Sequence, residues 1–318
     1  MVGSVSNNKK KILIIGYGSS GKRYDRIIKR YFKKYEVKIF TTKVYKKNSK
    51  FINKIKDLKN YNPDLTIFSN PSTKRLNFFN ILKNKKTNML FEKPLAANIF
   101  QSNLIKDSTK KSYKVGYNLK QLEILQKFKS ILKSKKFGKI LYFSIHVSQY
   151  LPSWREINYE NTVSAKKSLG GGAILELSHE IDYAVYLFGQ IKSLKSFFNN
   201  TKTLNIDAED VCKIILKTSN NIIGSIHLDF ASKVTKRFCE VATSEGNLRL
   251  NFIKKNIQLI SNKKKKIIFQ SKEQISQTYK NQIDQMINIV DKKKNKNYLT
   301  DLKSAKYILK IIQKIKNG

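Results

Sequence analysis

Cysteine is scarce in this chain of 318 residues. The two cysteines, Cys212 and Cys239, form no CxxC pair and have no spacing typical of a metal site. One disulfide between them is an alternative, but free thiols in a reducing cytoplasm are the simpler interpretation. We therefore predict a cytoplasmic protein that holds no metal.

Long apolar runs are also missing. The N-terminal segment 1–10 is polar and has no apolar stretch of the kind found in signal peptides. No apolar run elsewhere approaches the length of a membrane span. The sequence thus predicts neither a secretory signal nor a membrane partner.

Acidic residues are few beside the basic ones. Asp and Glu number 22 against 64 Lys and Arg, which gives a formal net charge of +42. One interpretation is a surface that binds nucleic acid or an anionic membrane. The other is a lysine-rich solvated surface, which we favour because only seven of the basic residues are arginine. Arginine is the better bidentate ligand of phosphates and bases, so we expect no nucleic-acid partner.

The first 120 residues alternate between short apolar runs and amphipathic segments. We predict strands over 11–15, 37–40, 64–68, 88–91 and 113–116, and helices over 22–32, 51–58, 76–82 and 99–105. This alternation is typical of a parallel sheet with right-handed crossovers.

The pattern changes after residue 120. We predict helices over 122–132, 173–188, 274–291 and 301–316, and strands over 140–147, 191–198, 211–217, 222–230, 238–243, 247–252, 257–260 and 266–269. Successive strands with short turns indicate a mostly antiparallel sheet. The predicted fold class is therefore α/β, with a parallel-sheet domain at 1–120 and an α+β domain at 121–318 that carries a mostly antiparallel open sheet.

A glycine-rich turn, Gly16-Tyr17-Gly18-Ser19-Ser20-Gly21, lies between the first strand and the first helix. In the dinucleotide-binding fingerprint the first glycine permits the tight turn, the second lets the backbone approach the pyrophosphate, and the third lets the helix pack closely. The helix N-terminus adds free N–H groups and a partial positive charge. The alternative is a glycine-rich turn in another α/β fold, but the alternating elements that follow favour dinucleotide binding.

The end of the second strand bears on which dinucleotide is bound. NAD enzymes usually carry an acid there for the ribose 2′-hydroxyl, whereas this strand ends in Phe40-Thr41-Thr42-Lys43. Two hydroxyls followed by Lys43 suit a 2′-phosphate, so we favour NADP over NAD. The alternative is that Thr41 and Thr42 are ordinary strand-end residues.

Two other strands end in polar segments. Ser69-Asn70-Pro71 follows the third strand, and Glu92-Lys93-Pro94 closes the fourth. Ligands of open α/β sheets bind outside the carboxyl ends of the strands. We therefore expect Lys93 to point into the ligand crevice.

Three glycines, Gly170-Gly171-Gly172, precede a predicted helix that carries Glu176, His179 and Asp182. The spacing of i, i+3 and i+6 predicts that the three side chains lie near one helix face. A histidine flanked by carboxylates can have its pKa tuned for proton transfer near neutral pH. The alternative is a surface histidine with two salt partners. The remaining histidines lie in predicted strands and are expected to be sheet residues: His146 and His227.

Taken in order, these motifs resemble the Gfo/Idh/MocA oxidoreductases, which include glucose–fructose oxidoreductase and inositol dehydrogenase. The resemblance covers nearly the whole chain and includes Val115-Gly116-Tyr117-Asn118-Leu119. The segment 149–155, followed by 164–167 and the three glycines, resembles a branch linked to surface-glycan and sialic-acid-type sugar pathways.

The resemblance implies a Rossmann domain plus an α/β domain whose open sheet often makes dimer or tetramer contacts. It implies hydride transfer between a nicotinamide ring and a carbon of a sugar or nucleotide sugar. Lys93 would hydrogen-bond the reacting hydroxyl and orient the nicotinamide, and His179 would be the general acid/base. Asp182 would bind substrate or orient His179, and Asn118 would line the cleft. Further substrate contacts are expected from Glu176, Trp154 and Arg155. The expected cofactor-binding residues are Gly16, Tyr17, Gly18, Ser19, Ser20, Gly21, Thr41, Thr42, Lys43, Ser69, Asn70, Pro71, Glu92 and Lys93.

Three features depart from the family pattern. Glu176 stands three residues before His179, where the family usually has Asp four before it. Arg75 replaces a histidine, and Lys120 with Gln121 replaces Arg and Phe. The substrate pocket is therefore expected to differ. A catalytically silent dinucleotide-binding sensor or scaffold is the main alternative, and a nucleic-acid-binding protein is a third.

Overall fold

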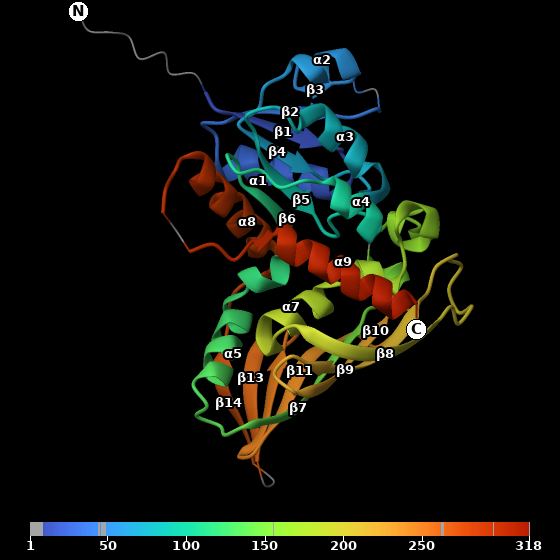
Figure 1. Cartoon of the computed structure of the whole chain (residues 1–318), viewed down its shortest axis with the longest axis vertical. Helices are drawn as coiled ribbons and strands as arrows, with labels where there is room; N and C mark the ends of the chain where they lie inside the picture. The colour runs from blue at the N-terminus through green and yellow to red at the C-terminus, as the bar shows by residue number, and fades with distance from the viewer. Residues whose placement is uncertain are drawn as a thin grey trace, which may run out of the picture.

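The computed structural model describes residues 9–43, 45, 49–154, 156–261, 264–294 and 296–317. Two sheets lie one above the other along the long axis of the molecule, with helices between them and around the upper sheet (Figure 1). The α/β fold class with one parallel and one mostly antiparallel sheet is confirmed.

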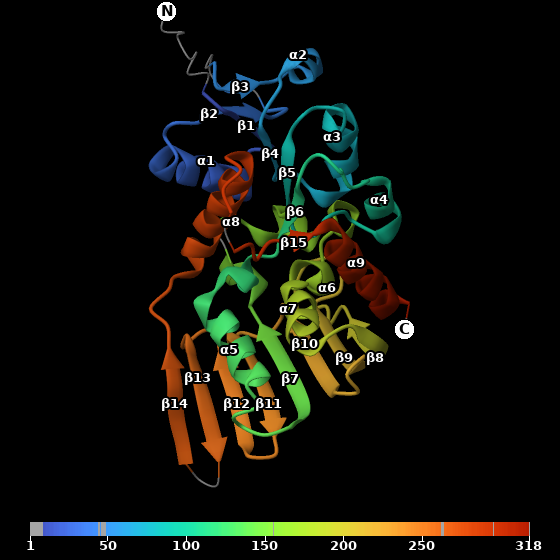
Figure 2. The ribbon, with the colours of Figure 1, turned by 60° about the vertical axis from the view of Figure 1, so that its left-hand side comes forward.

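The first sheet has seven strands in the order β15-β6-β5-β4-β1-β2-β3, and its pairs are parallel apart from β15 with β6. The strands are β1 (Lys11–Ile15), β2 (Glu36–Phe40), β3 (Phe51–Ile52), β4 (Leu65–Phe68), β5 (Asn88–Glu92), β6 (Tyr113–Gly116) and β15 (Thr300–Asp301). β4 apart from Thr66, and most of β1 and β5, are buried apolar residues, as expected of strands covered on both faces. The chain that follows β5 and β6 leads toward the second sheet (Figure 2).

The covering helices come from both ends of the chain. They are α1 (Ser19–Tyr31), α2 (Ile55–Asn60), α3 (Arg75–Leu82), α4 (Ile99–Leu104) and, from the C-terminal part, α8 (Ile275–Val290) and α9 (Leu302–Lys316). α8 packs against α1, β4 and β5, and α9 contacts both α4 and β8. The boundary at residue 120 stays a prediction, and the structure places β15 in the first sheet although it lies beyond that boundary.

The predicted helix over 51–58 is wrong in its first half. Phe51 and Ile52 form the edge strand β3, which pairs with Ile39 and Phe40 of β2, and the helix α2 begins only at Ile55. Pairing buries Ile52 to 9% exposure. A short apolar run fits either structure locally, and here the neighbouring strand decides.

The second sheet has eight strands in the order β14-β13-β12-β11-β7-β10-β9-β8, and its pairs are antiparallel apart from β7 with β10. The strands are β7 (Ile140–Ser148), β8 (Ile191–Asn199), β9 (Val211–Thr218), β10 (Ile223–Asp229), β11 (Lys236–Thr243), β12 (Gly246–Asn251), β13 (Asn256–Ser261) and β14 (Lys264–Gln270). One face packs against α5 (Glu123–Lys133), α6 (Ala173–Glu176), α7 (His179–Phe188) and α9. Cys212 and Cys239 are free and buried in this sheet.

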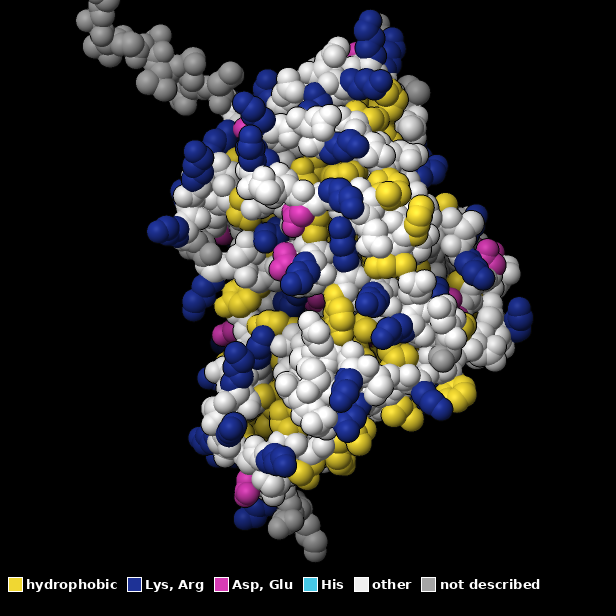
Figure 3. All heavy atoms as spheres, viewed as in Figure 1, with side chains coloured by type: hydrophobic (Ala, Val, Ile, Leu, Met, Phe, Trp, Pro, Cys, Tyr) yellow, Lys and Arg dark blue, Asp and Glu magenta, His cyan; other side chains and the backbone are white. Residues whose placement is uncertain are grey.

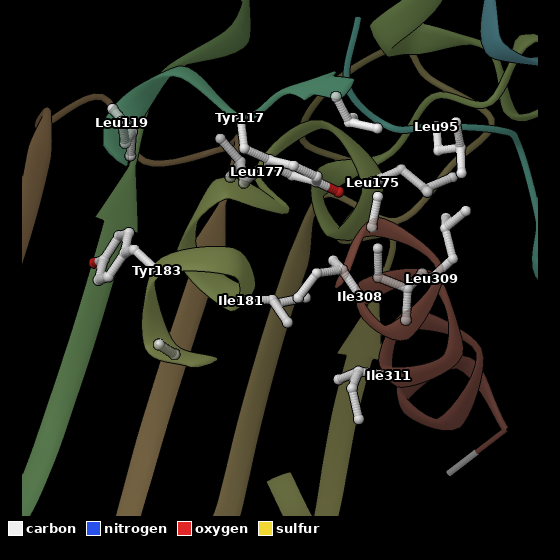
Figure 4. Close-up of a cluster of buried hydrophobic side chains, with 14 of the residues drawn as sticks. Leu95, Tyr117, Leu119, Leu175, Leu177, Ile181, Tyr183, Ile308, Leu309 and Ile311 are labelled. Carbon is white, nitrogen blue, oxygen red and sulfur yellow. The ribbon is translucent and has the colours of Figure 1, made fainter. Parts of the chain in front are cut away.

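An apolar cluster joins the two halves at the level of α7. It combines residues that follow β5 and β6 with residues of α6, α7 and α9: Leu95, Tyr117, Leu119, Leu175, Leu177, Ile181, Tyr183, Ile308, Leu309 and Ile311 (Figure 4). All ten are at most 4% exposed. Buried apolar surface of this extent holds the start of α7 next to the carboxyl ends of the first sheet.

The basic side chains are spread widely. Figure 3 shows Lys and Arg over both halves of the visible face instead of in one patch. Within the described ranges no helix is long and apolar enough to cross a bilayer.

Candidate active site

The glycine turn connects β1 to α1 at the carboxyl edge of the first sheet. A Cβ on Gly21 would lie 2.2 Å from the carbonyl oxygen of Gly16, and one on Gly16, whose φ is +93°, would lie 2.9 Å from the Asn70 backbone. These two glycines are required by the fold itself. A Cβ on Gly18 would meet nothing within 4 Å among the described residues, so this glycine faces open space.

The N-terminus of α1 lies directly behind that open space. The helix begins at Ser19 and Ser20, and neither a side-chain cap nor an acidic residue occupies its first turn. Its first N–H groups and its dipole are therefore available to an anion.

The segment after β4 forms the opposite wall of the turn. The Ser69 hydroxyl donates to the carbonyls of Ile15 (3.0 Å) and Gly16 (2.9 Å) and ties the two strand ends together. Asn70 is 7% exposed, and neither atom of its side-chain amide has a hydrogen-bond partner in the described part of the chain. A buried amide without partners beside an open glycine turn fits a polar ligand. The residues present thus suit a dinucleotide.

The end of β2 is organised as a turn. The Asn53 amide donates to the carbonyls of Thr41 (2.8 Å) and Lys43 (3.0 Å), and the Thr41 hydroxyl accepts the Lys43 N–H at 3.2 Å. Thr42 and Lys43 are exposed. Tyr17 packs its ring edge-on against Tyr45 and Phe51 and donates its hydroxyl to Asp25 at 2.9 Å. Thr42 and Lys43 are thus the side chains left to meet a ligand here, and the preference for NADP stays a prediction.

Lys93 follows β5 and reaches α6. Its ammonium donates to the Glu176 carbonyl at 2.8 Å and to the Glu176 carboxylate at 3.2 Å. The other carboxylate oxygen of Glu176 accepts from the Ser164 hydroxyl at 2.8 Å. Glu92 turns away and accepts from Tyr24 at 2.7 Å. The geometry therefore assigns Glu176 a direct partner in Lys93, a contact that the sequence did not indicate.

The helix predicted over 173–188 is broken, so Glu176 and His179 do not share a helix face. α6 ends at Glu176 and α7 begins at His179. The Ser178 hydroxyl bonds the Leu175 carbonyl at 2.7 Å. Serine side chains that bond nearby backbone carbonyls compete with the helical pattern. His179 consequently stands at the first turn of a new helix.

His179 is surrounded by cations instead of carboxylates. Its ring meets the ring of Tyr117 edge-on with centroids 5.7 Å apart, and its Nδ1 is buried without a partner among described residues. Burial, reinforced by the charges of Lys93, Arg237 and Lys120, holds the pKa of His179 well below its ordinary value of 6.5. The expectation of a pKa tuned near neutrality by Glu176 and Asp182 is wrong. The imidazole is neutral at neutral pH.

Asp182 forms a buried contact with Lys120, and its role toward His179 or a substrate stays a prediction. The Lys120 ammonium lies 3.1 Å from the Asp182 carboxylate and donates to the Thr300 hydroxyl at 2.5 Å. Asn118 lies nearby and donates its amide to Thr278 at 3.0 Å. Lys120, one of the positions that depart from the family pattern, thus ties α7 to the segment after β6 and to β15.

A second buried ion pair lies beside His179. The Arg237 guanidinium of β11 donates to both oxygens of Glu180, at 2.7 Å and 3.1 Å. The sequence motifs did not indicate this pair. A signal was present, since Arg237 is one of few arginines and stands in a strand.

Two of the predicted substrate residues, Trp154 and Arg155, follow β7. Trp154 donates its indole N–H to the Gln149 carbonyl at 3.2 Å and packs edge-on against Phe230, with centroids 5.0 Å apart. Arg155 lies outside the described residues. In the part of the chain that is described, no group of three or more His, Cys, Asp or Glu could hold a metal ion.

Comparison with known proteins gives consistent matches. Residues 125–249 match the model of the GFO/IDH/MocA C-terminal domain. The structure resembles the WlbA dehydrogenase from Chromobacterium violaceum, with a TM-score of 0.81 and 17% identity over 98% of this chain and 94% of that one. It also resembles myo-inositol 2-dehydrogenase from Lactobacillus plantarum, with a TM-score of 0.78 and 17% identity over 97% and 96%.

One curated sequence relative also matches. Oxidoreductase P35 from Formosa agariphila is 23% identical over 183 residues, which are 55% of each protein. The match thus spans about half the length of that relative.

Proposed function

We propose that this chain, whose residues 125–249 match the GFO/IDH/MocA C-terminal domain, is a nicotinamide-dinucleotide-dependent oxidoreductase that acts on a CH–OH group of a sugar or nucleotide sugar. The observation that carries the proposal is the convergence of Lys93 and His179 next to an open glycine turn. Relatives of the same fold support it, since levoglucosan dehydrogenase and the WlbA enzymes were solved with NADH.

The cofactor would be held by the glycine turn and the strand ends beside it. Backbone N–H groups of Ser19 and Ser20 face the expected pyrophosphate, and the amide of Asn70 supplies the donors and acceptors that lack partners in the described structure. Thr42 and Lys43 would meet the adenosine ribose, which favours NADP over NAD. When bound, the cofactor supplies the hydride acceptor or donor.

The residues of this chain would manage the proton and the position of the substrate. In alcohol oxidation the hydroxyl proton passes to the neutral imidazole of His179, and in ketone reduction the same nitrogen returns it. Two N–H donors of Lys93 go to Glu176, which leaves its third for the reacting oxygen. Glu176 therefore fixes the direction of the Lys93 ammonium.

The role of His179 is tested by the His179→Ala variant. We expect turnover to fall by about 10²–10⁴-fold, the usual contribution of a general acid/base, while the Kd for NADPH measured by fluorescence titration changes little. Equal turnover in the variant would overturn the assignment. A protein that binds NADPH but converts no sugar in a broad panel would favour the dinucleotide-binding sensor instead.

The proposed substrate is a nucleotide sugar of a glycan or sialic-acid-type pathway. WlbA enzymes of the same fold were solved with UDP-GlcNAcA, and another structure of this fold is a UDP-N-acetylglucosamine 3-dehydrogenase. A net charge of +42 also attracts a diphosphate. We expect UDP-GlcNAcA or UDP-GlcNAc to reduce the oxidised cofactor faster than myo-inositol does. The reverse order would refute the nucleotide-sugar part while leaving the oxidoreductase assignment intact.

We further propose that a second copy of this chain covers the outer face of the second sheet, giving a dimer or tetramer in the cytoplasm. That face carries Tyr142, Phe197, Ile215 and Ile223, which are 55%, 77%, 63% and 57% exposed. Exposed apolar side chains on a β-sheet face are typical of interfaces. Light scattering should give a dimer or tetramer for the wild type and a smaller species for Ile215→Lys, and a monomeric wild type would refute the proposal.

A further inference from the structure

Arg75 is buried among backbone carbonyls at the centre of the site. It begins α3 and is 2% exposed. One guanidinium nitrogen, Nη1, donates to the carbonyls of Glu92 at 2.6 Å, of Leu95 at 3.3 Å and of Pro94. The other, Nη2, donates to the carbonyl of Asn70 at 2.9 Å.

These four carbonyls belong to two different strand ends. Asn70 follows β4 and carries the amide that has no partner in the described structure, whereas Glu92, Pro94 and Leu95 flank Lys93 after β5. The donors of Arg75 thus hold the backbone on both sides of Lys93 and fix it relative to Asn70. A planar guanidinium can bridge acceptors in this way, whereas a lysine ammonium has fewer donors.

The charge of Arg75 is not balanced by a hydrogen-bonded carboxylate among the described residues. Burial lowers the pKa of Arg75 to about 10, against the attraction of Glu92, so the side chain is charged at neutral pH. Its contacts are to carbonyls and not to a carboxylate. Nε has no hydrogen-bond partner among the described residues, and both terminal nitrogens donate to the backbone of two loops. A buried charge bonded in this way fixes the two loops relative to each other.

We propose that Arg75 is a positioning residue that sets the Lys93 ammonium against Glu176 and at the same time fixes Asn70 in the dinucleotide cradle. The part of this inference that concerns catalysis rests on the proposed function. The part that concerns the position of Lys93 does not, because it can be measured without cofactor or substrate.

The test is trace acetylation of the lysines with acetic anhydride, read out by peptide mass spectrometry. In the wild type, Lys93 should react slowly because its side chain is 15% exposed and bonded to Glu176. Exposed Lys59 is the internal reference. In Arg75→Gln the rate at Lys93 should rise about tenfold, as expected when a charged hydrogen bond is lost, while the rate at Lys59 stays the same.

The matched control is Arg249→Gln, which changes the net charge equally but alters a partly exposed side chain of β12. It should leave the Lys93 rate unchanged. Arg75→Lys, which keeps the charge, should give a smaller rise and is the variant to measure if Arg75→Gln does not fold. An unchanged Lys93 rate in either folded variant would overturn the proposal, and so would failure of both variants to fold, which would indicate a purely structural role.

A second measurement separates this inference from the proposed function. NADPH fluorescence titration should show weaker binding to Arg75→Gln than to the wild type and to Arg249→Gln. If the wild type binds neither NADPH nor NADH, the proposed function fails, while the acetylation result at Lys93 still decides the positioning role. If the wild type binds and Arg75→Gln binds equally well, the link to Asn70 is refuted.

Discussion

Breaking the ion pair between Glu180 and Arg237 should destabilise the protein far more than a surface charge change. Glu180 is 0% exposed and Arg237 is 9% exposed, and two hydrogen bonds join them. Glu180→Gln leaves the guanidinium buried without its countercharge. Removing one partner of a buried pair costs about 3–5 kcal/mol, which for a chain of this length corresponds to a fall in Tm of about 5–8 °C.

The assay is a double-mutant cycle read out by thermal and urea unfolding. Glu180→Leu with Arg237→Met should recover most of the stability lost in either single variant, because the remaining charge is gone. The control is Glu240→Gln, which removes a half-exposed partner 3.7 Å from Arg249 and should cost at most about 1 kcal/mol. A Glu180→Gln variant as stable as the control would refute the reasoning. A double variant whose loss of stability equals the sum of the losses in the two single variants would refute it as well.

Other predictions concern the glycine turn and the titrating groups. Gly18→Ala should leave Tm unchanged yet weaken NADPH binding in a fluorescence titration, because its Cβ meets nothing within 4 Å in the described structure. Gly21→Ala, whose Cβ would lie 2.2 Å from the Gly16 carbonyl oxygen, should lower Tm as well. Equal changes of Tm in the two variants would contradict this. Burial and nearby cations lower the pKa of His146 from 6.5 to about 4. The unfolded state therefore binds the proton at a higher pH than the folded state, and the free energy of unfolding should fall as the pH drops from 6.5 to about 4. Melting curves of His146→Asn should show a shallower fall of Tm over the same pH range. Tyr117→Phe should cost little in Tm, because the buried hydroxyl interacts with Ser178 but has no hydrogen-bond partner of good geometry among the described residues; a loss like that of Glu180→Gln would contradict this.

The strands and the glycine turn could be predicted because their signals are local. The apolar run of β1 and the spacing of Gly16, Gly18 and Gly21 specify a strand, a turn and a helix start without reference to other parts of the chain. Lys93 was expected in the crevice because it follows the carboxyl end of a strand of the parallel sheet. The resemblance to the family then suggested its role.

The contacts that shape the site could not be predicted in the same way. The Lys93–Glu176 pair joins residues 83 positions apart, and periodicity says nothing about which acid a lysine reaches. The helix is interrupted between α6 and α7, where the Ser178 hydroxyl donates to the Leu175 carbonyl, whereas the apolar pattern continues through these residues. The cations around His179 come from three separate elements, so their effect on its pKa follows only from the assembled fold.

The last strand has a consequence for how the protein is made. β15 pairs antiparallel with β6 and covers the edge of the first sheet, although the whole second sheet is synthesised between them. Until Thr300 and Asp301 leave the ribosome, β6 offers an unpaired strand edge, which is a site for wrong pairing with other chains. A truncation that removes β15 would therefore act on the N-terminal sheet, and the N-terminal half expressed alone would be expected to aggregate.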